Sequence, residues 1–257
     1  GELYVKFGAL AIPITIIWIV AITNAVNLID GLDGLAVGVS AIACMTMLAV
    51  SLLIGEVPIA ILLAVLAGAC VGFMPFNLNP ASIFMGDTGS TFLGFMLATL
   101  SIQGMFKVYA IISFAVPFLI LGLPIFDTAF AFTRRILSGR SPFSPDRGHV
   151  HHRLIDMGFN QKQTVAILYI ISTVLGLLAV VLTTSGEYRA IVMVLVVLIT
   201  CVVGGGIYLS AERRKMKLHE QKLHELNQQE SEQQKIAEQT QDTDDTSDRG
   251  GFDNEDN

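Results

Sequence analysis

Four polar residues with regular spacing interrupt an otherwise apolar stretch near the start of the chain. They are Asn24, Asn27, Asp30 and Asp33, in the sequence Asn-Ala-Val-Asn-Leu-Ile-Asp-Gly-Leu-Asp-Gly. A spacing of three puts them on one stripe of a helical turn, and the glycine after each aspartate weakens the helix and lets the backbone approach a ligand. Carboxylates beside a membrane span are costly unless a cation, a donor or water meets them, so this stretch is a candidate functional site. The alternative is a solvated connection in which Asn and Asp act only as caps and turn formers.

Asp87 is the second candidate, because it lies between two glycines in Gly-Asp-Thr-Gly, just before an apolar run. A carboxylate in this place can hold Mg²⁺, a hard cation that proteins commonly bind through one or two carboxylates together with substrate phosphates. The same carboxylate could instead cap the backbone N–H groups of the helix that follows.

Three histidines within four residues are the third candidate. His149, His151 and His152 are flanked by Arg147 and Arg153. Arg and imidazolium groups around a glycine-containing loop suit phosphate oxygens, for which Arg supplies bidentate donors. Zinc is the alternative, but it needs three or four ligands. No Cys lies nearby, and the two remaining histidines lie in the C-terminal tail.

Asp127 follows Pro124 near the end of an apolar segment. The proline predicts a kink in this helix. We expect Asp127 to be hydrated or paired with Arg134 or Arg135, with a direct ligand role as the open alternative and no catalytic role.

The elements that must position these residues are membrane helices. The chain is 53% hydrophobic and 15% charged, with a mean hydropathy of +0.62, which excludes an ordinary soluble domain. Apolar runs of about 17–25 residues can cross a bilayer. We therefore predict an all-α, polytopic transmembrane bundle of about seven spans, and expect Cys44, Cys70 and Cys201 to be buried apolar residues. The predicted spans are 7–24, 35–54, 58–76, 89–105, 109–132, 164–183 and 189–209.

This segmentation places every polar motif on one face of the membrane. That face receives the loops 25–34, 77–88 and 133–163 and the tail from 210. Most Lys and Arg residues fall on these segments, which makes the face cytoplasmic, since translocation of short basic loops is disfavoured.

Two domains are expected. Residues 1–209 form the transmembrane domain, in which acidic and basic residues balance, so the net charge of −6 belongs to the tail at 210–257. Basic residues at the start of the tail would anchor it at anionic head groups. We expect a polar helix over 211–239 and disorder over 240–257.

Acidic and cationic loops on one face predict a magnesium–phosphate site at the membrane surface, open to one soluble and one lipid substrate. The chemistry implied is phosphoryl transfer. A transporter is an alternative of another class, but its site would need polar residues deep within the spans. A non-catalytic scaffold acting through the tail is a third.

Four segments resemble the polyprenyl-phosphate sugar-1-phosphate transferases. They read Asn-Ala-Val-Asn-Leu-Ile-Asp-Gly-Leu-Asp-Gly-Leu-Ala at 24–36, Ile-Phe-Met-Gly-Asp-Thr-Gly-Ser at 83–90, Pro-Ile-Phe-Asp-Thr at 124–128 and His-Val-His-His-Arg-Leu at 149–154. The His-x-His-His form is more similar to the branch that moves N-acetylglucosamine-1-phosphate, including initiators of teichoic acid linkage-unit and O-antigen synthesis. The muramoyl-pentapeptide branch tends to have three consecutive histidines.

The resemblance implies that undecaprenyl phosphate attacks the β-phosphorus of a UDP-sugar and releases UMP, with Mg²⁺ as cofactor. Expected partners are the UDP-sugar, the lipid substrate and the bilayer of the plasma membrane, without nucleic acid; a homodimer is left open. The residue roles it implies are a metal ligand at Asp87, catalytic groups at Asp30, Asp33, His149, His151 and His152, and substrate-binding groups at Asn27, Asn77 and Arg147.

One departure from the family pattern affects this expectation. Family members also have an Asp-Asp pair on an earlier cytoplasmic loop, whereas the only adjacent pair in this chain is Asp244-Asp245, in the tail. Together with the start at Gly1, this predicts that the chain is a C-terminal portion of a longer enzyme and that it is inactive alone.

Overall fold

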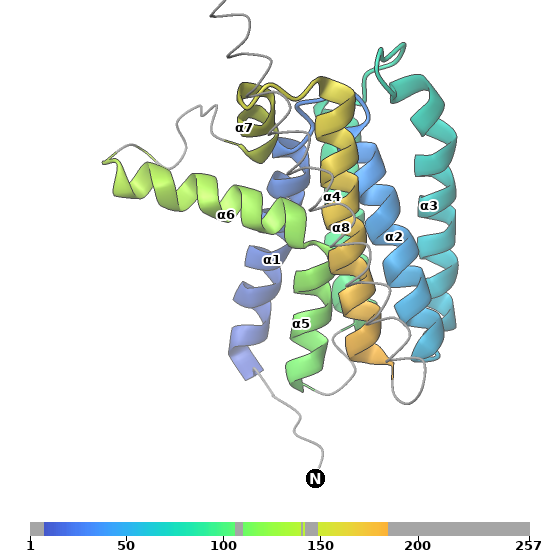
Figure 1. The fold of residues 1–257 in the computed structure, drawn as a ribbon. Helices are drawn as coiled ribbons and strands as arrows, with labels where there is room; N and C mark the ends of the chain where they lie inside the picture. Colours follow the sequence, from blue (N-terminus) through green and yellow to red (C-terminus); the bar gives the residue numbers. More distant parts are fainter. Residues whose placement is uncertain (1–7, 106–109, 140, 142–148, 185–257) are drawn as a thin grey trace, which may run out of the picture. The chain divides into compact units, whose positions relative to one another are not determined.

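The structure is a computed structural model that describes residues 8–105, 110–139, 141 and 149–184, and this part of the chain is helical with connecting turns. The elements in chain order are the 3-10 turn η1 (Gly8–Leu10) and the helices α1 (Ala11–Leu28), α2 (Leu35–Leu53), α3 (Val57–Asn77), α4 (Gly86–Met105), α5 (Ala110–Ile120), α6 (Gly122–Leu137), α7 (Val150–Asp156) and α8 (Gln161–Thr183). Figure 1 shows their arrangement.

Four helical segments are long and apolar enough to cross a membrane, which confirms the prediction of membrane helices. They are Gly8–Leu28, Leu35–Leu53, Val57–Asn77 and Gln161–Thr183. α4 forms over the predicted span 89–105 but begins at Gly86, so that its first turn contains Asp87. The predicted span 189–209 and the tail lie outside the described residues. The count of seven spans therefore stays a prediction.

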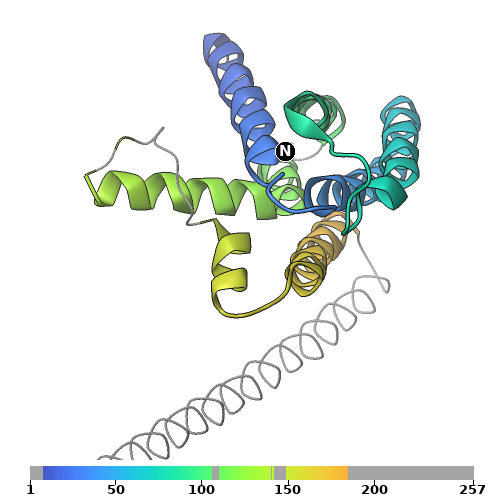
Figure 2. The same ribbon diagram turned by 90° about the horizontal axis from the view of Figure 1, so that it is seen from above.

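The prediction of one continuous helix over 109–132 is wrong, because the chain divides it at Leu121 into two helices. α5 has 11 residues and α6 has 16, and each is shorter than a bilayer crossing requires. α6 runs across the direction of its neighbours, as the views from the side and from above both show (Figures 1 and 2). Pro124 lies in the first turn of α6, where a backbone N–H has no helical partner to lose, so the break precedes the proline.

α2 is the central helix of the described bundle. Of its apolar window, 67% is buried inside the protein, against 17% for Gly8–Leu28. Met47 of α2 packs in one core with Leu63 of α3 and Leu97 of α4. Cys44 and Cys70 are buried and free, as predicted, and Cys201 lies outside the described residues.

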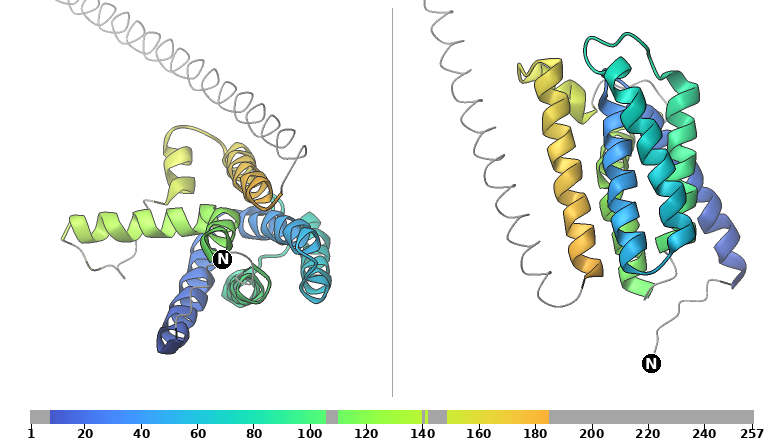
Figure 3. Two further views of the ribbon diagram at one scale, coloured as in Figure 1. Left: turned by 90° about the horizontal axis from the view of Figure 1, so that it is seen from below. Right: turned by 90° about the vertical axis from the view of Figure 1, so that its right-hand side faces the viewer.

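The described parts of the three polar loops gather at one end of the bundle, as predicted. The α1–α2 loop (29–34), the α3–α4 loop (78–85) and α7 all lie at the upper end in Figure 1, and the side view in Figure 3 agrees. The α2–α3 connection lies at the opposite end. Candidate residues that are far apart in the sequence are thereby brought to one surface.

Candidate active site

The end of α1 supplies the first of the candidate residues, although the predicted helical stripe is not continuous. α1 ends at Leu28, so Asp30 and Asp33 lie on the α1–α2 loop, while the two asparagines stay on the helix. Asn24 donates a hydrogen bond to the Val20 carbonyl of its own helix and remains exposed. The α1–α2 loop ends at Gly34, whose φ of 80° lies in the left-handed region that favours glycine.

Asn27 connects α1 to the start of α4. Its Nδ2 donates to Oδ1 of Asp87 at 3.2 Å and to Oγ of Ser90 at 2.9 Å. Ser90 is buried and also donates to the Gly86 carbonyl, which secures the first turn of α4. Asp87 itself is exposed on this turn, at the positive end of the helix dipole.

Asp30 and Asp87 lie near enough to each other for their charges to interact. Burial raises the pKa of the Asp30 carboxyl above its usual value, and the negative charge of Asp87 raises it further. Among the described residues there is no group of three or more His, Cys, Asp and Glu side chains that could hold a metal ion. Two carboxylates fit Mg²⁺, which takes few protein ligands and completes its shell with water and phosphate oxygens.

Asp33 ties the α1–α2 loop to the α3–α4 loop. Its Oδ2 accepts hydrogen bonds from Nδ2 of Asn79 at 2.9 Å and from the Ala81 amide at 3.1 Å. The same Asn79 nitrogen donates to Oε1 of Gln161, the first residue of α8, at 2.9 Å. Asp33 thus makes contacts that orient two loops.

Asn77 is buried at the end of α3, and backbone groups occupy its amide. Its Oδ1 accepts from the Gly34 amide at 3.1 Å, and its Nδ2 donates to the Ile83 carbonyl at 3.0 Å. Buried backbone groups need such partners. The side chain predicted to bind substrate therefore also organises the two loops.

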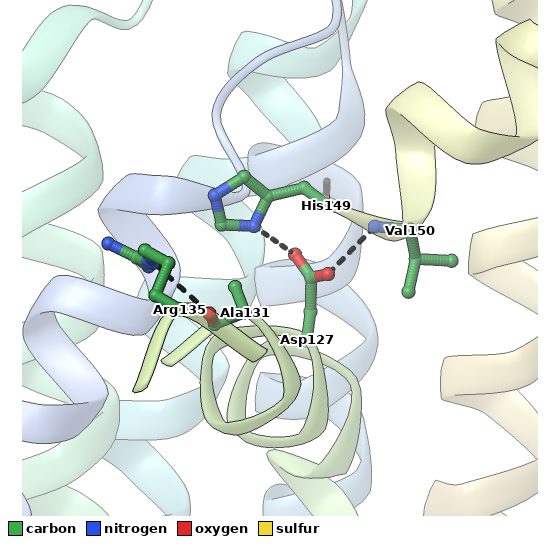
Figure 4. Close-up of polar contacts among 5 residues, drawn as sticks. All are labelled: Asp127, Ala131, Arg135, His149 and Val150. Atoms are coloured by element: carbon green, nitrogen blue, oxygen red, sulfur yellow. Dashed lines mark hydrogen bonds and ion pairs between the residues drawn. The ribbon is translucent and has the colours of Figure 1, made fainter. Parts of the chain in front are cut away.

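Asp127 of α6 holds the start of α7, as the close-up in Figure 4 shows. Its Oδ2 lies 2.9 Å from Nδ1 of His149, and its Oδ1 accepts a hydrogen bond from the Val150 amide at 2.8 Å. Both Asp127 and His149 are buried. We expected Asp127 to be hydrated or paired with Arg134 or Arg135, but both of its oxygens contact the histidine segment. The drawn contact of Arg135 is to the Ala131 carbonyl, at 3.1 Å.

Sequence reasoning missed this contact between Asp127 and His149. A usable signal was present, since a carboxylate at the end of one apolar segment and a histidine cluster in the following loop were expected on the same membrane face. Spacing alone did not pair them, because 22 positions separate the two residues.

His151 packs against the α1–α2 loop. A Cβ added at Gly31 would lie 2.6 Å from Nε2 of His151, so glycine is what permits the approach. The ring stacks on His149, with centroids 5.7 Å apart, and contacts His152 at 4.3 Å. His151 is buried, and its Nε2 has no hydrogen-bond partner among the described residues.

His151 does not have the positive charge that the sequence suggested for the histidine cluster. Burial, followed by the neighbouring His152, lowers the pKa of His151 to about 4, despite the opposing effect of Asp127. His151 is therefore neutral at neutral pH. The unpartnered Nε2 then offers either a donor or an acceptor, depending on the tautomer.

Of the two flanking arginines, Arg153 lies within the described residues. The Arg153 guanidinium lies 4.7 Å from the ring centroid of Phe130 on α6, a cation–π distance. Arg147, predicted to bind substrate, lies outside the described residues.

The sequence of this chain is similar to those of known proteins. Residues 2–105 match the model of glycosyl transferase family 4. A probable undecaprenyl-phosphate N-acetylglucosaminyl 1-phosphate transferase of Bacillus subtilis is 42% identical over 194 residues, which are 76% of this chain and 54% of that protein.

Two further relatives are named for other lipid-linked sugar-phosphate transfers. A decaprenyl-phosphate N-acetylglucosaminephosphotransferase of Mycobacterium tuberculosis is 41% identical over 184 residues, 63% of this chain and 45% of the relative. A phospho-N-acetylmuramoyl-pentapeptide-transferase of Staphylococcus aureus is 34% identical over 184 residues, 69% of this chain and 56% of the relative. The chain thus spans about half the length of the curated relatives it matches.

Proposed function

We propose that this chain, which belongs to the polyprenyl-phosphate sugar-1-phosphate transferases of glycosyl transferase family 4, carries part of the active site of such an enzyme. The reaction is transfer of N-acetylglucosamine-1-phosphate from UDP-N-acetylglucosamine to undecaprenyl phosphate. A phosphate oxygen of the lipid forms a bond to the β-phosphorus of the nucleotide sugar. The bond from that phosphorus to the bridging oxygen breaks, and UMP leaves with the electron pair.

The observation that carries this proposal is the convergence of three separate segments at one end of the bundle. Asn27 joins α1 to Asp87, Asp33 joins the α1–α2 loop to the α3–α4 loop, and His151 of α7 rests on Gly31. A nucleotide diphosphate needs an acidic metal-binding side and a side rich in hydrogen-bond donors close together, and this arrangement offers both.

Asp30 and Asp87 are the residues that would hold Mg²⁺. Bound there, the ion would offset negative charge on the diphosphate. Asn27 fixes the Asp87 carboxylate by its hydrogen bond, and Asn77 and Asp33 hold the loop that carries Asp30. These contacts keep the two carboxylates preorganised before substrate arrives.

The histidine segment would face the phosphates of the substrate. Asp127 orients His149 through Nδ1, which leaves Nε2 of that ring for the ligand. Nε2 of neutral His151 is buried against Gly31, so this ring would hold the α1–α2 loop in place beside the phosphates. Arg147, which precedes this segment in the sequence, remains our proposed further phosphate contact.

The finer assignments rest on the relatives and the charge pattern. The similarity to the Bacillus subtilis protein favours N-acetylglucosamine as the sugar. From the resemblance of the sequence motifs we propose a teichoic acid or related envelope polymer as the destination and the plasma membrane as the location. The distribution of Lys and Arg favours a site that faces the cytoplasm. A homodimer is the assembly to test first.

The position of the phosphate label distinguishes this reaction from ordinary glycosyl transfer. Membranes containing the full-length protein are incubated with Mg²⁺, undecaprenyl phosphate and UDP-N-acetylglucosamine labelled in its β-phosphate. We expect label in the lipid fraction and UMP in the aqueous fraction. Release of labelled UDP, or no label in the lipid despite folded protein, would overturn the proposal.

One of the relatives points to a second candidate sugar. The Staphylococcus aureus relative is named for the muramoyl-pentapeptide reaction. The same assay with UDP-N-acetylmuramoyl-pentapeptide therefore runs in parallel, and the substrate with the higher kcat/KM assigns the sugar.

A further inference from the structure

Tyr169 of α8 reaches the loop that carries Asp30 and Asp33. Its hydroxyl donates a hydrogen bond to the carbonyl of Gly34, the residue at the N-terminus of α2. The two residues are 135 positions apart in the sequence. No part of the reaction proposed above requires a tyrosine at this place.

Gly34 is held from both sides. Asn77 of α3 accepts a hydrogen bond from its amide, and Tyr169 of α8 donates one to its carbonyl. Two helices that flank α2 thus fix the point where the α1–α2 loop ends. Both backbone polar groups of Gly34 are therefore bonded to side chains of helices that pack against α2.

The ring of Tyr169 is fitted to a gap made by glycine. A Cβ added at Gly38, one turn after Gly34, would overlap the Tyr169 ring, and a Cβ at Gly34 would lie 3.3 Å from its hydroxyl. Small residues in this place let α8 approach α2 closely. The ring is therefore positioned by packing as well as by its hydroxyl.

α8 is linked to the same loop a second time, indirectly, through Asn79 of the α3–α4 loop. Gln161, at the start of α8, accepts a hydrogen bond from Asn79, and Asn79 also donates to Asp33. Tyr169 lies about two turns further along the helix. α8 is thus linked to the α1–α2 loop directly at Gly34 and through Asn79 at Asp33.

We propose that Tyr169 is a positioning residue, whose hydrogen bond to Gly34 sets the place of Asp30 relative to Asp87. This inference rests on the proposed function, because the carboxylate pair gives the position its importance. It assigns α8 a part in preorganising the divalent-cation site, although α8 contributes no carboxylate to it.

The test compares Tyr169→Phe with Thr183→Val in the full-length protein in lipid nanodiscs. The first removes the hydroxyl and keeps the ring. The second removes an α8 hydroxyl whose one bond among the described residues is to the Ala179 carbonyl of its own helix. Hydrogen exchange of peptides covering 29–38, Mn²⁺ binding followed by electron paramagnetic resonance, and the Mg²⁺ concentration for half-maximal activity are measured for each.

We expect Tyr169→Phe to speed exchange over 29–38 and to weaken Mn²⁺ binding about 3- to 10-fold, the range for loss of one hydrogen bond. The Mg²⁺ requirement should rise by a similar factor, and excess Mg²⁺ should restore activity. Thr183→Val should match the wild type. Gly38→Ala, which displaces the ring, should reproduce the faster exchange.

Two results would be decisive against the inference. One is exchange over 29–38 and Mn²⁺ affinity in Tyr169→Phe that equal those of Thr183→Val. The other is faster exchange throughout α2 and α8 with unchanged Mn²⁺ affinity, which would indicate a merely structural tyrosine. A wild-type protein that transfers no sugar phosphate would instead overturn the proposed function, and the exchange measurement would still decide the contact.

Discussion

Asp127 and His149 form a buried carboxylate–imidazole pair that joins α6 to α7, with 2.9 Å between Oδ2 and Nδ1. The other carboxylate oxygen accepts from the Val150 amide, so the same side chain also secures the first turn of α7. A carboxylate bound to one ring nitrogen fixes the tautomer and the direction of the other. Asp127 is therefore placed to fix the orientation of the His149 ring.

Asp127→Asn should lower kcat of the transferase about 10- to 100-fold, because one charge-assisted hydrogen bond is lost and the amide presents a donor to Nδ1. The measurement is kcat at saturating concentrations of both substrates. Asp156→Asn, at an exposed carboxylate of α7, is the control. Equal kcat in the two variants would show that Asp127 does not orient a catalytic histidine.

Asp87→Asn should reduce activity about 100-fold or more, since a ligand of the proposed cation is lost. The same change should raise the melting temperature of the metal-free protein at neutral pH. The negative charge of Asp87 helps raise the pKa of Asp30, so the folded state binds the Asp30 proton more tightly than the unfolded chain does. Stability is then lost as pH rises from about 3.8 through the raised pKa, and removing Asp87 lessens that loss.

The melting temperatures of Asp87→Asn and the wild type are measured in the presence of a chelator, once at pH 7 and once below pH 3.8. The gain in melting temperature should be present at pH 7 and disappear at the acid pH, where Asp30 is protonated in both states. A variant that is inactive and also less stable at pH 7 would contradict the repulsion between the two carboxylates.

Gly31→Ala should displace His151, because the new Cβ would lie 2.6 Å from Nε2. A shift of this kind in the site should lower kcat about 10- to 100-fold, and overpacking should cost about 1–3 kcal/mol of stability. Gly72→Ala in α3 is the matched control, since nothing lies within 4 Å of a Cβ there. Adding His151→Ala to Gly31→Ala should restore the melting temperature but not the activity; failure to restore it would place the strain elsewhere.

Hydropathy predicted the helices but not their directions. The run over 109–132 is apolar on average, and that average does not record that Leu121 ends one helix and that the next turns across the bundle. The faces of α6 held the missing information, because exposed Phe126 and Phe130 alternate with buried Asp127 and Ala131. Periodicity within the run, rather than its mean, distinguishes the two cases.

Residue type predicted which side chains gather at the site, but not which atoms meet. Asp30, Asp87 and the histidines reach the same end of the bundle as expected from the alternation of loops. The partners of Asp33 and Asn77 are mainly backbone groups, whose need for a hydrogen bond depends on burial and cannot be found in a motif. The helical stripe failed for a related reason, because α1 ends at Leu28, before either aspartate.

The pH dependence of protein stability under acidic conditions should depend on His151. Burial lowers the pKa of His151 from 6.5 to about 4, so between these values the unfolded chain binds a proton that the folded protein does not. Stability should therefore decrease as pH falls from about 6.5 to about 4. His151→Gln, which cannot be protonated, should flatten this part of the profile, as measured by melting temperature at half-unit steps in pH. His152→Gln, at a more exposed ring, is the control and should leave the slope in place. If the pH dependence of stability persisted in His151→Gln but disappeared in His152→Gln, the titrating group would be His152. The basis for treating His151 as neutral in the site would then be lost.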